Sequence, residues 1–387
     1  MNKKKLNIGI IGYNFMGKAH SNAWKKVSKF FDTSAEPVLK VACGQNLENL
    51  TNFADKWGWE EVETDWKKLI KRPDIEIIDI ALPPHLHYEI AVAAAKAGKH
   101  IFCEKPIAMN LEQAMDMYEK SEACNVVHYL NHNYRRVPAI ALAKQMINNG
   151  TIGNIYHWRC AYQQDWITSP DFPLTWQLQA QYAKAGPHWD LNSHCVDLAH
   201  FLVGDITDVT CITKNFIAER PLAKKGGTRN LKAEVGSTEM GKVTVEDAVL
   251  MMVNFKNGAI GSFEATRFAN GRKNKLSFEI YGSKGSLTFN LERLNELHYY
   301  SQEDKDGLKG FRTISVTEDS HPYVSHWWPA GHIIGYEHTF VHAASDFIEA
   351  VANNANIEPN FKDGVAIIKV LEAGLRSSIE KRTIAID

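Results

Sequence analysis

The sequence lacks the features that mark several special classes of protein. Its longest apolar runs fall well short of the roughly 20 residues that a membrane-spanning helix needs. With 44 basic and 45 acidic side chains, it carries no excess charge to favour nucleic acid or an anionic membrane. It has six cysteines but no C-x-x-C pair, a pattern typical of reduced thiols rather than of disulfides. Internal repeats and low-complexity tracts are also missing.

What is present is the composition of a soluble globular protein, with 44% hydrophobic and 23% charged residues. The length of 387 residues predicts roughly two or three domains. Lys3–Lys5 followed by the apolar run Leu6–Ile11 resembles a secretory signal, but the run is short, and Asn14 and Lys18 follow without a cleavage-like site. We therefore expect a cytoplasmic protein that binds neither nucleic acid nor a membrane.

The first motif is a strand, a glycine turn and a helix. The buried-strand run Leu6–Ile11 leads directly into Gly12-Tyr13-Asn14-Phe15-Met16-Gly17, and a helical pattern follows. Gly12 permits a tight turn, Gly17 allows the helix to pack closely on the strand, and the free N–H groups of the helix start suit a pyrophosphate. Asn14 replaces the middle glycine and is among the residue types that tolerate a positive φ. The expected cofactor contacts here are Gly12, Asn14, Phe15 and Met16.

The second strand, Val38–Cys43, ends in Gly44-Gln45-Asn46. In NAD-binding Rossmann units an acidic residue near this point binds the ribose 2′-hydroxyl. Here neither an acid nor an arginine is present, so Gln45 or Asn46 is the expected partner of a ribose hydroxyl, and both NAD and NADP stay open. Gly44 and Gln45 are the expected cofactor contacts.

Strands and helices alternate up to about residue 130, which predicts a doubly wound α/β domain over residues 1–130. The strand Ile75–Leu82 runs into Pro83-Pro84-His85-Leu86-His87, and the strand at His100–Cys103 runs into Glu104-Lys105-Pro106. Residues at the carboxyl ends of parallel strands face the ligand crevice, and Pro106 favours an extended Lys105. We therefore expect Lys105 to point at a ligand; the alternative is a solvated charge pair.

A second chemical motif lies in Asp190-Leu191-Asn192-Ser193-His194, which we expect at the start of a helix that continues to Leu202. Asp190 and His194 are four residues apart and so share one helix face, where a carboxylate and an imidazole can form an acid–base unit. The alternative is a helix N-terminus with Asp190 near the positive dipole end and His194 in the core. His188 and His200 add no zinc signature, so we expect no metal.

The rest of the chain reads as a second domain over residues 131–387. Strand-like runs recur from Val209 onwards, and Asn257-Gly258 is a hairpin turn, so we expect a large, mostly antiparallel open sheet. Trp166–Trp176 is rich in aromatics and reads as a loop over a site. Glu219–Thr244, with Gly226-Gly227, is expected to be a mobile excursion or interface arm. The C-terminal helix, residues 364–381, is expected to pack between the domains.

Four motifs occur in order along the chain: Gly12–His20, Pro83–His87, Glu104–Pro106 and Asn133-Tyr134-Arg135-Arg136. Together they resemble the glucose–fructose oxidoreductase / inositol dehydrogenase / MocA family, and the resemblance covers nearly the whole chain. Three further segments are most similar to the levoglucosan dehydrogenase branch of that family: Gln164-Asp165-Trp166, Phe172–Trp176 and Gly204-Asp205-Ile206. The departure is Pro187-His188-Trp189, where relatives usually carry small residues; we expect Trp189 to narrow or reshape the pocket.

The resemblance implies an NAD(P)-dependent oxidation of a secondary alcohol in a sugar, anhydrosugar or cyclitol, by a homodimer or homotetramer. It assigns His194 as general acid/base, Lys105 as hydrogen-bond donor to the reacting oxygen, and Asp190 as the partner of a neighbouring hydroxyl. Further expected cofactor contacts are Leu82, Pro83, His87, Glu104, Lys105 and Asn133. Expected substrate contacts are Arg135, Gln164, Trp166 and Tyr336. The alternatives are a glycoside-processing enzyme with tightly bound NAD and a transient keto intermediate, and a non-catalytic nucleotide-binding regulator.

Overall fold

The computed structural model describes residues 3–223 and 235–386, and the chain divides into two compact units. The first unit comprises Met1–Arg136 and Gly335–Ile368, and the second comprises Val137–Ile334 and Lys369–Asp387. Residues 335–368, which the sequence places in the second domain, thus group with the first unit. The reason is that their helix packs against the first helix of the chain, with Trp24 and Phe347 ring centroids 6.3 Å apart.

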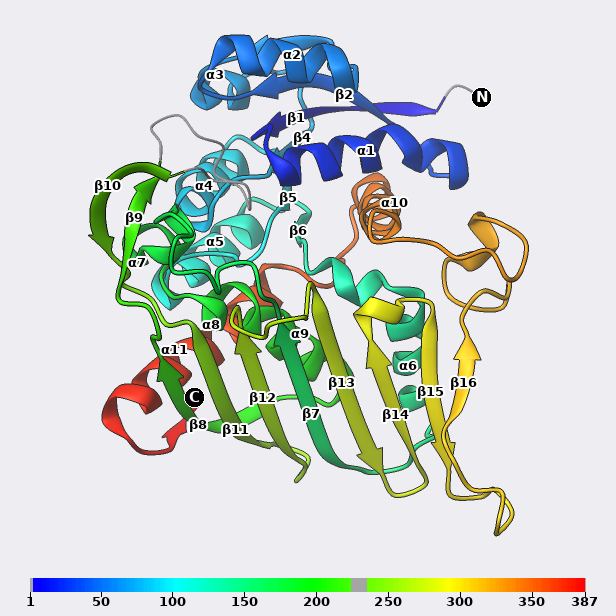
Figure 1. Cartoon of the computed structure of the whole chain (residues 1–387). Helices are drawn as coiled ribbons and strands as arrows, with labels where there is room; N and C mark the ends of the chain where they lie inside the picture. The colour runs from blue at the N-terminus through cyan, green and yellow to red at the C-terminus, as the bar shows by residue number, and fades with distance from the viewer. Residues whose placement is uncertain (1–2, 224–234, 387) are drawn as a thin grey trace. The chain divides into compact units, whose positions relative to one another are not determined.

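The first unit is built on a six-stranded parallel sheet in the order β3-β2-β1-β4-β5-β6 (Figure 1). Its strands are β1 (Lys4–Ile11), β2 (Ala35–Cys43), β3 (Glu61–Glu63), β4 (Ile77–Ile80), β5 (His100–Cys103) and β6 (His128–Leu130). The strand order reverses between β1 and β4, and in such sheets ligands bind beyond the carboxyl ends of the strands at this point. The predicted doubly wound dinucleotide-binding fold is confirmed.

The helices of the first unit begin and end where the sequence signals place them. Asn46 caps α2 by accepting a hydrogen bond from the backbone of Asn49, and Gly58 ends that helix with a left-handed φ of 80°. Asn110 caps α5 in the same way. The helical segments are α1 (Phe15–Phe30), α2 (Leu47–Trp57), α3 (Trp66–Ile70), η1 (Pro84–Leu86), α4 (His87–Lys96), α5 (Leu111–Ala123), η2 (Asn133–Arg136) and α10 (His338–Asn353).

The second unit is built on a nine-stranded sheet in the order β16-β15-β14-β13-β7-β12-β11-β8-β17 (Figure 1). Its paired strands are antiparallel except β7 and β12, so the predicted mostly antiparallel open sheet is confirmed. Gly258, with a φ of 89°, makes the predicted turn between β11 and β12. The strands are β7 (Ile155–Gln163), β8 (Ile206–Lys214), β11 (Ala248–Phe255), β12 (Ile260–Thr266), β13 (Lys275–Gly282), β14 (Gly285–Asn290), β15 (Glu296–Ser301), β16 (Arg312–Ser315) and β17 (Ile384–Ala385).

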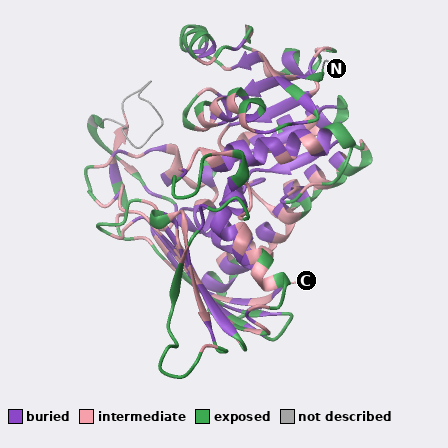
Figure 2. Cartoon of the chain, turned by 90° about the vertical axis from the view of Figure 1, so that its right-hand side faces the viewer, coloured by how far each residue is buried: buried purple, intermediate pink, exposed green. Residues whose placement is uncertain are grey.

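Helices cover one face of this sheet. Along β11, the buried side chains of Val249, Met251 and Val253 alternate with the exposed side chains of Leu250 and Met252, so one face is packed and the other is open. Figure 2 colours the whole chain by how far each residue is buried. The packed face contacts α6, α8 and α9. The helical segments are α6 (Pro138–Asn148), η3 (Trp176–Leu178), α7 (Ala180–Ala183), α8 (Pro187–Asp190), α9 (Asn192–Leu202), η4 (Leu291–Arg293), η5 (Val324–His326) and α11 (Phe361–Glu380), which runs on from the first unit.

The segment Glu219–Thr244 contains a separate two-stranded antiparallel sheet, formed by β9 (Glu219–Ala223) and β10 (Val235–Lys242). The backbone N–H of Leu174 donates to the carbonyl of Pro221 at 2.8 Å, so this hairpin contacts the aromatic loop. Residues 224–234, including the predicted excursion at Gly226-Gly227, lie outside the described residues. Across the described ranges, no helix combines the length and apolar character needed to cross a membrane.

Candidate active site

The start of α1 has the shape that a dinucleotide phosphate needs. Gly12 has a φ of 114°, and a Cβ there would clash with the carbonyl oxygen of Ala81. A Cβ at Gly17 would clash with the carbonyl oxygen of Gly12, so both positions need glycine. The first turn of α1 has no acidic residue, which leaves its N–H groups and positive dipole end suited to an anion. These residues fit the diphosphate of NAD.

Asn14 is the N-cap of α1, with a φ of -80°, and its exposed side chain makes no capping hydrogen bond. The expectation that it uses a tolerance for positive φ is wrong, because any residue adopts this extended conformation. Phe15 is 57% exposed and stacks on Tyr336, with ring centroids 6.5 Å apart, while Met16 is half-buried. Tyr336, an expected substrate contact, therefore lies beside the start of α1 in the first unit.

The residues after β2 narrow the choice of ribose partner. The side-chain oxygen of Asn46 accepts the Asn49 N–H at 2.9 Å, so it serves as a helix cap. Gln45 is exposed and stays the predicted partner of a ribose hydroxyl. Tyr13 lies against Gly44, where a Cβ would clash with its ring. Leu82 and Pro83 are half-buried, and the Leu82 side chain lies 3.2 Å from where a Gly12 Cβ would be.

A buried charge network lies next to Lys105. The His20 ring is within 2.8 Å of the Asp79 carboxylate through Nδ1 and within 2.9 Å of the Glu104 carboxylate through Nε2. Asn131 Nδ2 donates to Glu104 Oε1 at 2.6 Å, and Trp24 Nε1 donates to Asp79 Oδ2 at 2.7 Å. Lys105 itself follows β5 and is half-buried. The chain thus places alternating charges around the carboxyl end of β5.

The pKa shifts in this network follow from its geometry. Burial lowers the pKa of His20, but the charges and hydrogen bonds of Asp79 and Glu104 outweigh it and raise that pKa to about 10. Burial raises the pKa of Glu104, but the His20 hydrogen bond and charge, with Lys105 and Asn131, bring it below the ordinary value. The Glu104 carboxylate is buried among these partners, and its contact with the cofactor stays a prediction.

Two more expected ligand contacts have structural roles in the first unit. The ring nitrogens of His87 lie 2.9 Å from the Pro106 carbonyl and 2.7 Å from the Leu82 carbonyl, and the residue is fully buried. Burial lowers its pKa despite those carbonyls. Arg135 is buried and pairs with Asp363 at 3.0 Å. The printed partners of both side chains belong to the first unit, and the cofactor contact of His87 and the substrate contact of Arg135 stay predictions.

Asn133 is also buried, and its Nδ2 donates to Thr339 Oγ1 at 2.8 Å. This bond joins η2 to α10 within the first unit. A contact of Asn133 with the cofactor stays a prediction.

In the second unit, Asp190 does not start the helix that carries His194. Asp190 is the last residue of α8, and α9 begins at Asn192, so the single helix expected from the sequence is wrong. Pro187 at the start of α8 accounts for a separate short helix, since proline favours the first helical turn. The Asp190 side chain is 42% exposed, and its Oδ2 accepts from Arg267 Nη2 at 2.6 Å.

A chain of hydrogen bonds connects the other predicted residues of this unit. Trp166 Nε1 donates to Gln164 Oε1 at 2.7 Å, and Gln164 Nε2 donates to Asn274 Oδ1 at 2.9 Å. The Tyr162 hydroxyl donates to the same Asn274 oxygen at 2.8 Å. The Tyr162 ring meets the ring of the buried His194 edge-on, with centroids 5.7 Å apart. Amides, an indole, a phenol and an imidazole thus lie in one continuous cluster.

Sequence reasoning missed three members of this cluster, Tyr162, Arg267 and Asn274. A topological signal connects them: Arg267 directly follows β12, Asn274 directly precedes β13, and Tyr162 lies near the end of β7. Because β7 is parallel to β12 and antiparallel to β13, the carboxyl ends of β7 and β12 and the amino end of β13 lie at the same end of the sheet, and the three residues meet there. The sequence alone does not give the pairing of these strands, so it could not predict that the three residues meet.

The aromatic loop Trp166–Trp176 is held by a buried arginine. Arg220 donates to the backbone carbonyls of Ile167 at 2.6 Å, Ser169 at 2.8 Å and Phe172 at 3.2 Å. Ile167 is also part of a small core cluster under the loop. Hydrogen bonds from Arg220 therefore hold the loop against β9.

His188 and Trp189, the departure from the family pattern, are both buried. His188 Nε2 lies 2.8 Å from the Leu371 carbonyl, and a Cβ at Gly374 would come within 2.8 Å of the His188 ring. Burial lowers the pKa of His188 to about 4, so the ring is neutral. Only 1% of Trp189 is exposed, and its effect on the shape of the pocket stays a prediction. Within the described ranges, no group of His, Cys, Asp or Glu residues is placed to hold a metal ion.

The parallel sheet, the glycine turn at its switch point and the anion-ready start of α1 define a dinucleotide-binding oxidoreductase of the Rossmann class. The chain belongs to the GFO/IDH/MocA oxidoreductase family. Residues 6–132 match the oxidoreductase family's NAD-binding Rossmann fold, and residues 140–288 match the GFO/IDH/MocA C-terminal domain.

Known proteins of this family resemble the chain over its full length. A levoglucosan dehydrogenase from Pseudarthrobacter phenanthrenivorans is 42% identical over 380 residues, which cover 98% of this chain and 97% of the relative. The structure of levoglucosan dehydrogenase in complex with NADH and levoglucosan matches with a TM-score of 0.93 and 41% identity, over 99% of this chain and 100% of the other. An oxidoreductase domain protein from Kribbella flavida matches with a TM-score of 0.94 and 42% identity, over 100% of both chains.

Proposed function

We propose that this oxidoreductase transfers hydride between NAD and a secondary alcohol of a sugar, anhydrosugar or cyclitol, with levoglucosan as the first substrate to test. The observation that carries the proposal is the cluster in the second unit, where the Asp190 carboxylate lies with an indole, amides and the His194 imidazole. Polar groups that accept and donate hydrogen bonds, beside a flat apolar ring, suit a polyol. The 42% identity to a levoglucosan dehydrogenase supports the same class.

In this proposal, the first unit carries the residues that bind the dinucleotide, and the second unit carries His194, Asp190 and the other residues of the polar cluster that bind the substrate. Gly12, Gly17 and the N–H groups at the start of α1 hold the diphosphate, and Gln45 binds a ribose hydroxyl. NAD, when bound, supplies the hydride acceptor.

Each of the acting residues has one role in the proposed reaction. His194 takes the proton of the reacting hydroxyl. The Lys105 ammonium donates a hydrogen bond to the same oxygen and stabilises the negative charge that develops on it. Asp190 accepts a hydrogen bond from a neighbouring hydroxyl and so orients the sugar.

The test is the turnover of Lys105→Ala and His194→Ala. Each variant is expected to lower kcat by at least about a hundredfold, the scale for losing a positioned acid–base group. NADH affinity is expected to survive in His194→Ala, since that residue serves the substrate. Lys96→Ala and His298→Ala, at more exposed positions of the same residue types, are matched controls with wild-type turnover expected. Near wild-type turnover in either test variant would contradict the catalytic role proposed for that residue. Cofactor retained through purification, with substrate consumed but no net NADH, would instead favour glycoside processing.

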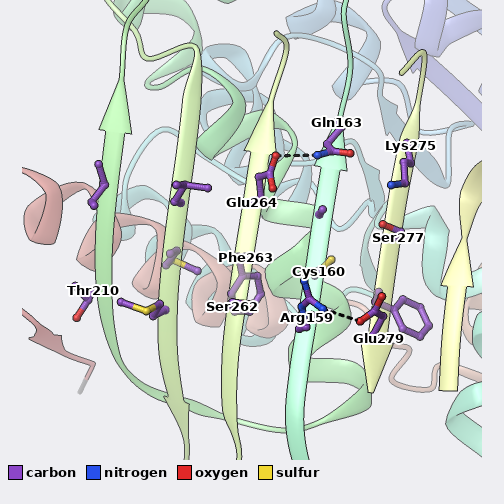
Figure 3. Close-up of a pocket in the computed structure, with 16 residues that line it drawn as sticks. Arg159, Cys160, Gln163, Thr210, Ser262, Phe263, Glu264, Lys275, Ser277 and Glu279 are labelled. Atoms are coloured by element: carbon purple, nitrogen blue, oxygen red, sulfur yellow. Dashed lines mark hydrogen bonds and ion pairs between the residues drawn. The ribbon is translucent and has the colours of Figure 1, made fainter. Parts of the chain in front are cut away.

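We also propose that the open face of the large sheet is covered by a second copy of this chain. Large apolar side chains more than half exposed line three neighbouring strands of that face: Ile212, Leu250, Met252 and Ile260. Soluble monomers rarely expose such a patch. The same face carries both Arg159 and Glu279, paired at 3.1 Å, along with Glu264 and Lys275 (Figure 3). A two-fold-related copy would meet opposite charges on this face.

The oligomer proposal is tested by mass in solution. The wild type is expected to be a dimer or tetramer by light scattering, and Leu250→Glu with Met252→Glu is expected to give a smaller species. Leu308→Glu with Ile333→Glu, on exposed residues away from that face, is the control. A monomeric wild type, or an unchanged mass in the first variant, would contradict the proposal.

We further propose a cytoplasmic location, which is supported by six free cysteines, five of them buried. Fractionation of the host cells tests this. Recovery in an exported or membrane fraction would contradict it.

A further inference from the structure

Arg267 connects two of the residues proposed to meet the substrate. It follows β12 directly, and only 1% of its side chain is exposed. Its Nη2 donates to Asp190 Oδ2 at 2.6 Å, and its guanidinium lies over the Trp166 ring, 5.2 Å from the centroid. One side chain therefore holds both a carboxylate and an aromatic ring by geometry specific to a planar cation.

The Arg267 guanidinium is costly to bury. Its Nε and Nη1 are buried and have no hydrogen-bond partner among the described residues. Arg220 is equally buried and its Nε also has no partner among those residues, but both of its terminal nitrogens donate, to the carbonyls of Ile167, Ser169 and Phe172. A buried ion pair with unpaired donors does not stabilise a fold more than an apolar side chain of the same size. The pair with Asp190 therefore does not by itself account for the burial of Arg267.

We propose that Arg267 is a positioning residue for the sugar site: it fixes the Asp190 carboxylate and the Trp166 ring relative to each other so that both meet one ligand. This inference rests on the proposed function. The Asp190 side chain is 42% exposed, so a ligand can reach the carboxylate that Arg267 holds through Oδ2. An ionised carboxylate only accepts hydrogen bonds, so it receives a sugar hydroxyl. The held indole face packs on the C–H surface of the same sugar.

The test compares Arg267→Met with Arg267→Lys, each with NAD and levoglucosan. Methionine keeps much of the apolar volume but removes the charge, and is expected to lower kcat/KM for the sugar by about tenfold to a hundredfold, the range for a hydrogen bond to a charged group. Most of that loss is expected in KM. Lysine keeps the charge without the planar face and is expected to lose less. NADH affinity is expected to be unchanged in both.

Thermal unfolding separates positioning from a structural role. Arg267→Met is expected to keep or raise Tm while activity falls, because it removes a poorly satisfied buried charge and leaves Asp190 hydrated. Arg220→Met, the matched control, is expected to lower Tm because three carbonyls lose their donor. In combination with Asp190→Asn, Arg267→Met is expected to cause a smaller further loss than it causes alone, since part of its effect acts through Asp190 and only the part through Trp166 is left.

The outcomes separate this inference from the proposed function. Wild-type kcat/KM in Arg267→Met, or a fall in Tm like that of Arg220→Met, would overturn the positioning role alone if Asp190→Asn is impaired. Wild-type activity in Asp190→Asn would overturn the role of Asp190 in the proposed function and, with it, the inference about Arg267. Losses that add in the double variant would also overturn the inference.

Discussion

At the scale of residues, the first unit shows how a buried histidine is held as a cation at neutral pH. His20 and Asp79 are fully buried, and Glu104 nearly so, which would be costly for isolated charges. The charges alternate in sign, so each carboxylate faces the His20 imidazolium, and Lys105 follows Glu104 in the chain. The network therefore holds the segment that carries Lys105 by electrostatic pairing in addition to apolar packing.

This network predicts a pH dependence of stability. The folded pKa of His20 is about 10, above its unfolded value of 6.5, so its contribution is fully present below pH 6.5 and is lost as pH rises through about 10. Glu104 has a lowered folded pKa, so its contribution is present above pH 4.5 and is lost as pH falls through the folded value. His20→Gln is expected to cost about 3–5 kcal/mol at neutral pH, as for a broken buried pair, and to remove the alkaline loss.

Denaturant unfolding of wild type and His20→Gln at a series of pH values measures this. His298→Gln, a half-exposed histidine, is the control and is expected to leave the pH profile unchanged. The same alkaline loss of free energy of unfolding in wild type and His20→Gln would show that His20 does not carry it.

Some site residues could be predicted from the chain alone because their role is local. Gly12 directly follows β1 and Lys105 lies two residues after β5, and the carboxyl end of a parallel strand determines where such residues lie. The motifs that contain Glu104 and His87 do not predict the orientation of these side chains, because it depends on His20, Pro106 and other partners distant in the sequence. Arg267 lies 77 residues from Asp190, and no local pattern links the two.

At the scale of elements, the glycine turn before α1 is the feature on which nucleotide binding depends most. Gly12→Ala places a Cβ against the Ala81 carbonyl in a left-handed conformation, so it is expected to abolish NADH binding or destabilise the first unit. Gly98→Ala is the matched control, since Gly98 also has a positive φ, 69°, but a Cβ there would meet nothing within 4 Å.

NADH titration by fluorescence, with Tm measured in parallel, compares the two glycine variants. Gly98→Ala is expected to lose only about 1 kcal/mol of stability, the strain of a left-handed alanine, and to keep wild-type affinity. Wild-type affinity in Gly12→Ala would contradict the role of this turn.

Periodic elements were predictable, and edge elements were not. The strand Ala248–Phe255 alternates buried and exposed side chains, and the sequence places it correctly. The strands β9, β10, β16 and β17 were missed because they are short, polar or near glycines, and they form only where a partner strand is at hand. Asp190 was assigned to the wrong helix because α8 and α9 are separated by Leu191 alone. Leu191 itself has a helical backbone conformation, so the sequence shows no sign of the break.

At the scale of the whole molecule, the two compact units are not two consecutive stretches of the chain. Helix α10 comes late in the sequence but belongs to the first unit, where Phe347 packs on Phe102 with ring centroids 5.4 Å apart. A reading along the chain assigns this segment to the second domain because no composition change marks its return. Family and fold class were nonetheless predictable, because the motifs that define them lie in the first third of the chain.

The central claim is that this chain oxidises a sugar or cyclitol with NAD through His194. The most direct measurement is the initial rate of nicotinamide reduction with levoglucosan and a panel of sugars and cyclitols, with NAD and NADP in turn, for wild type and His194→Ala. The account predicts NADH formation with at least one of these substrates and a fall of at least about a hundredfold in the variant. No reduction of either cofactor with any substrate, or an equal rate in His194→Ala, would contradict it.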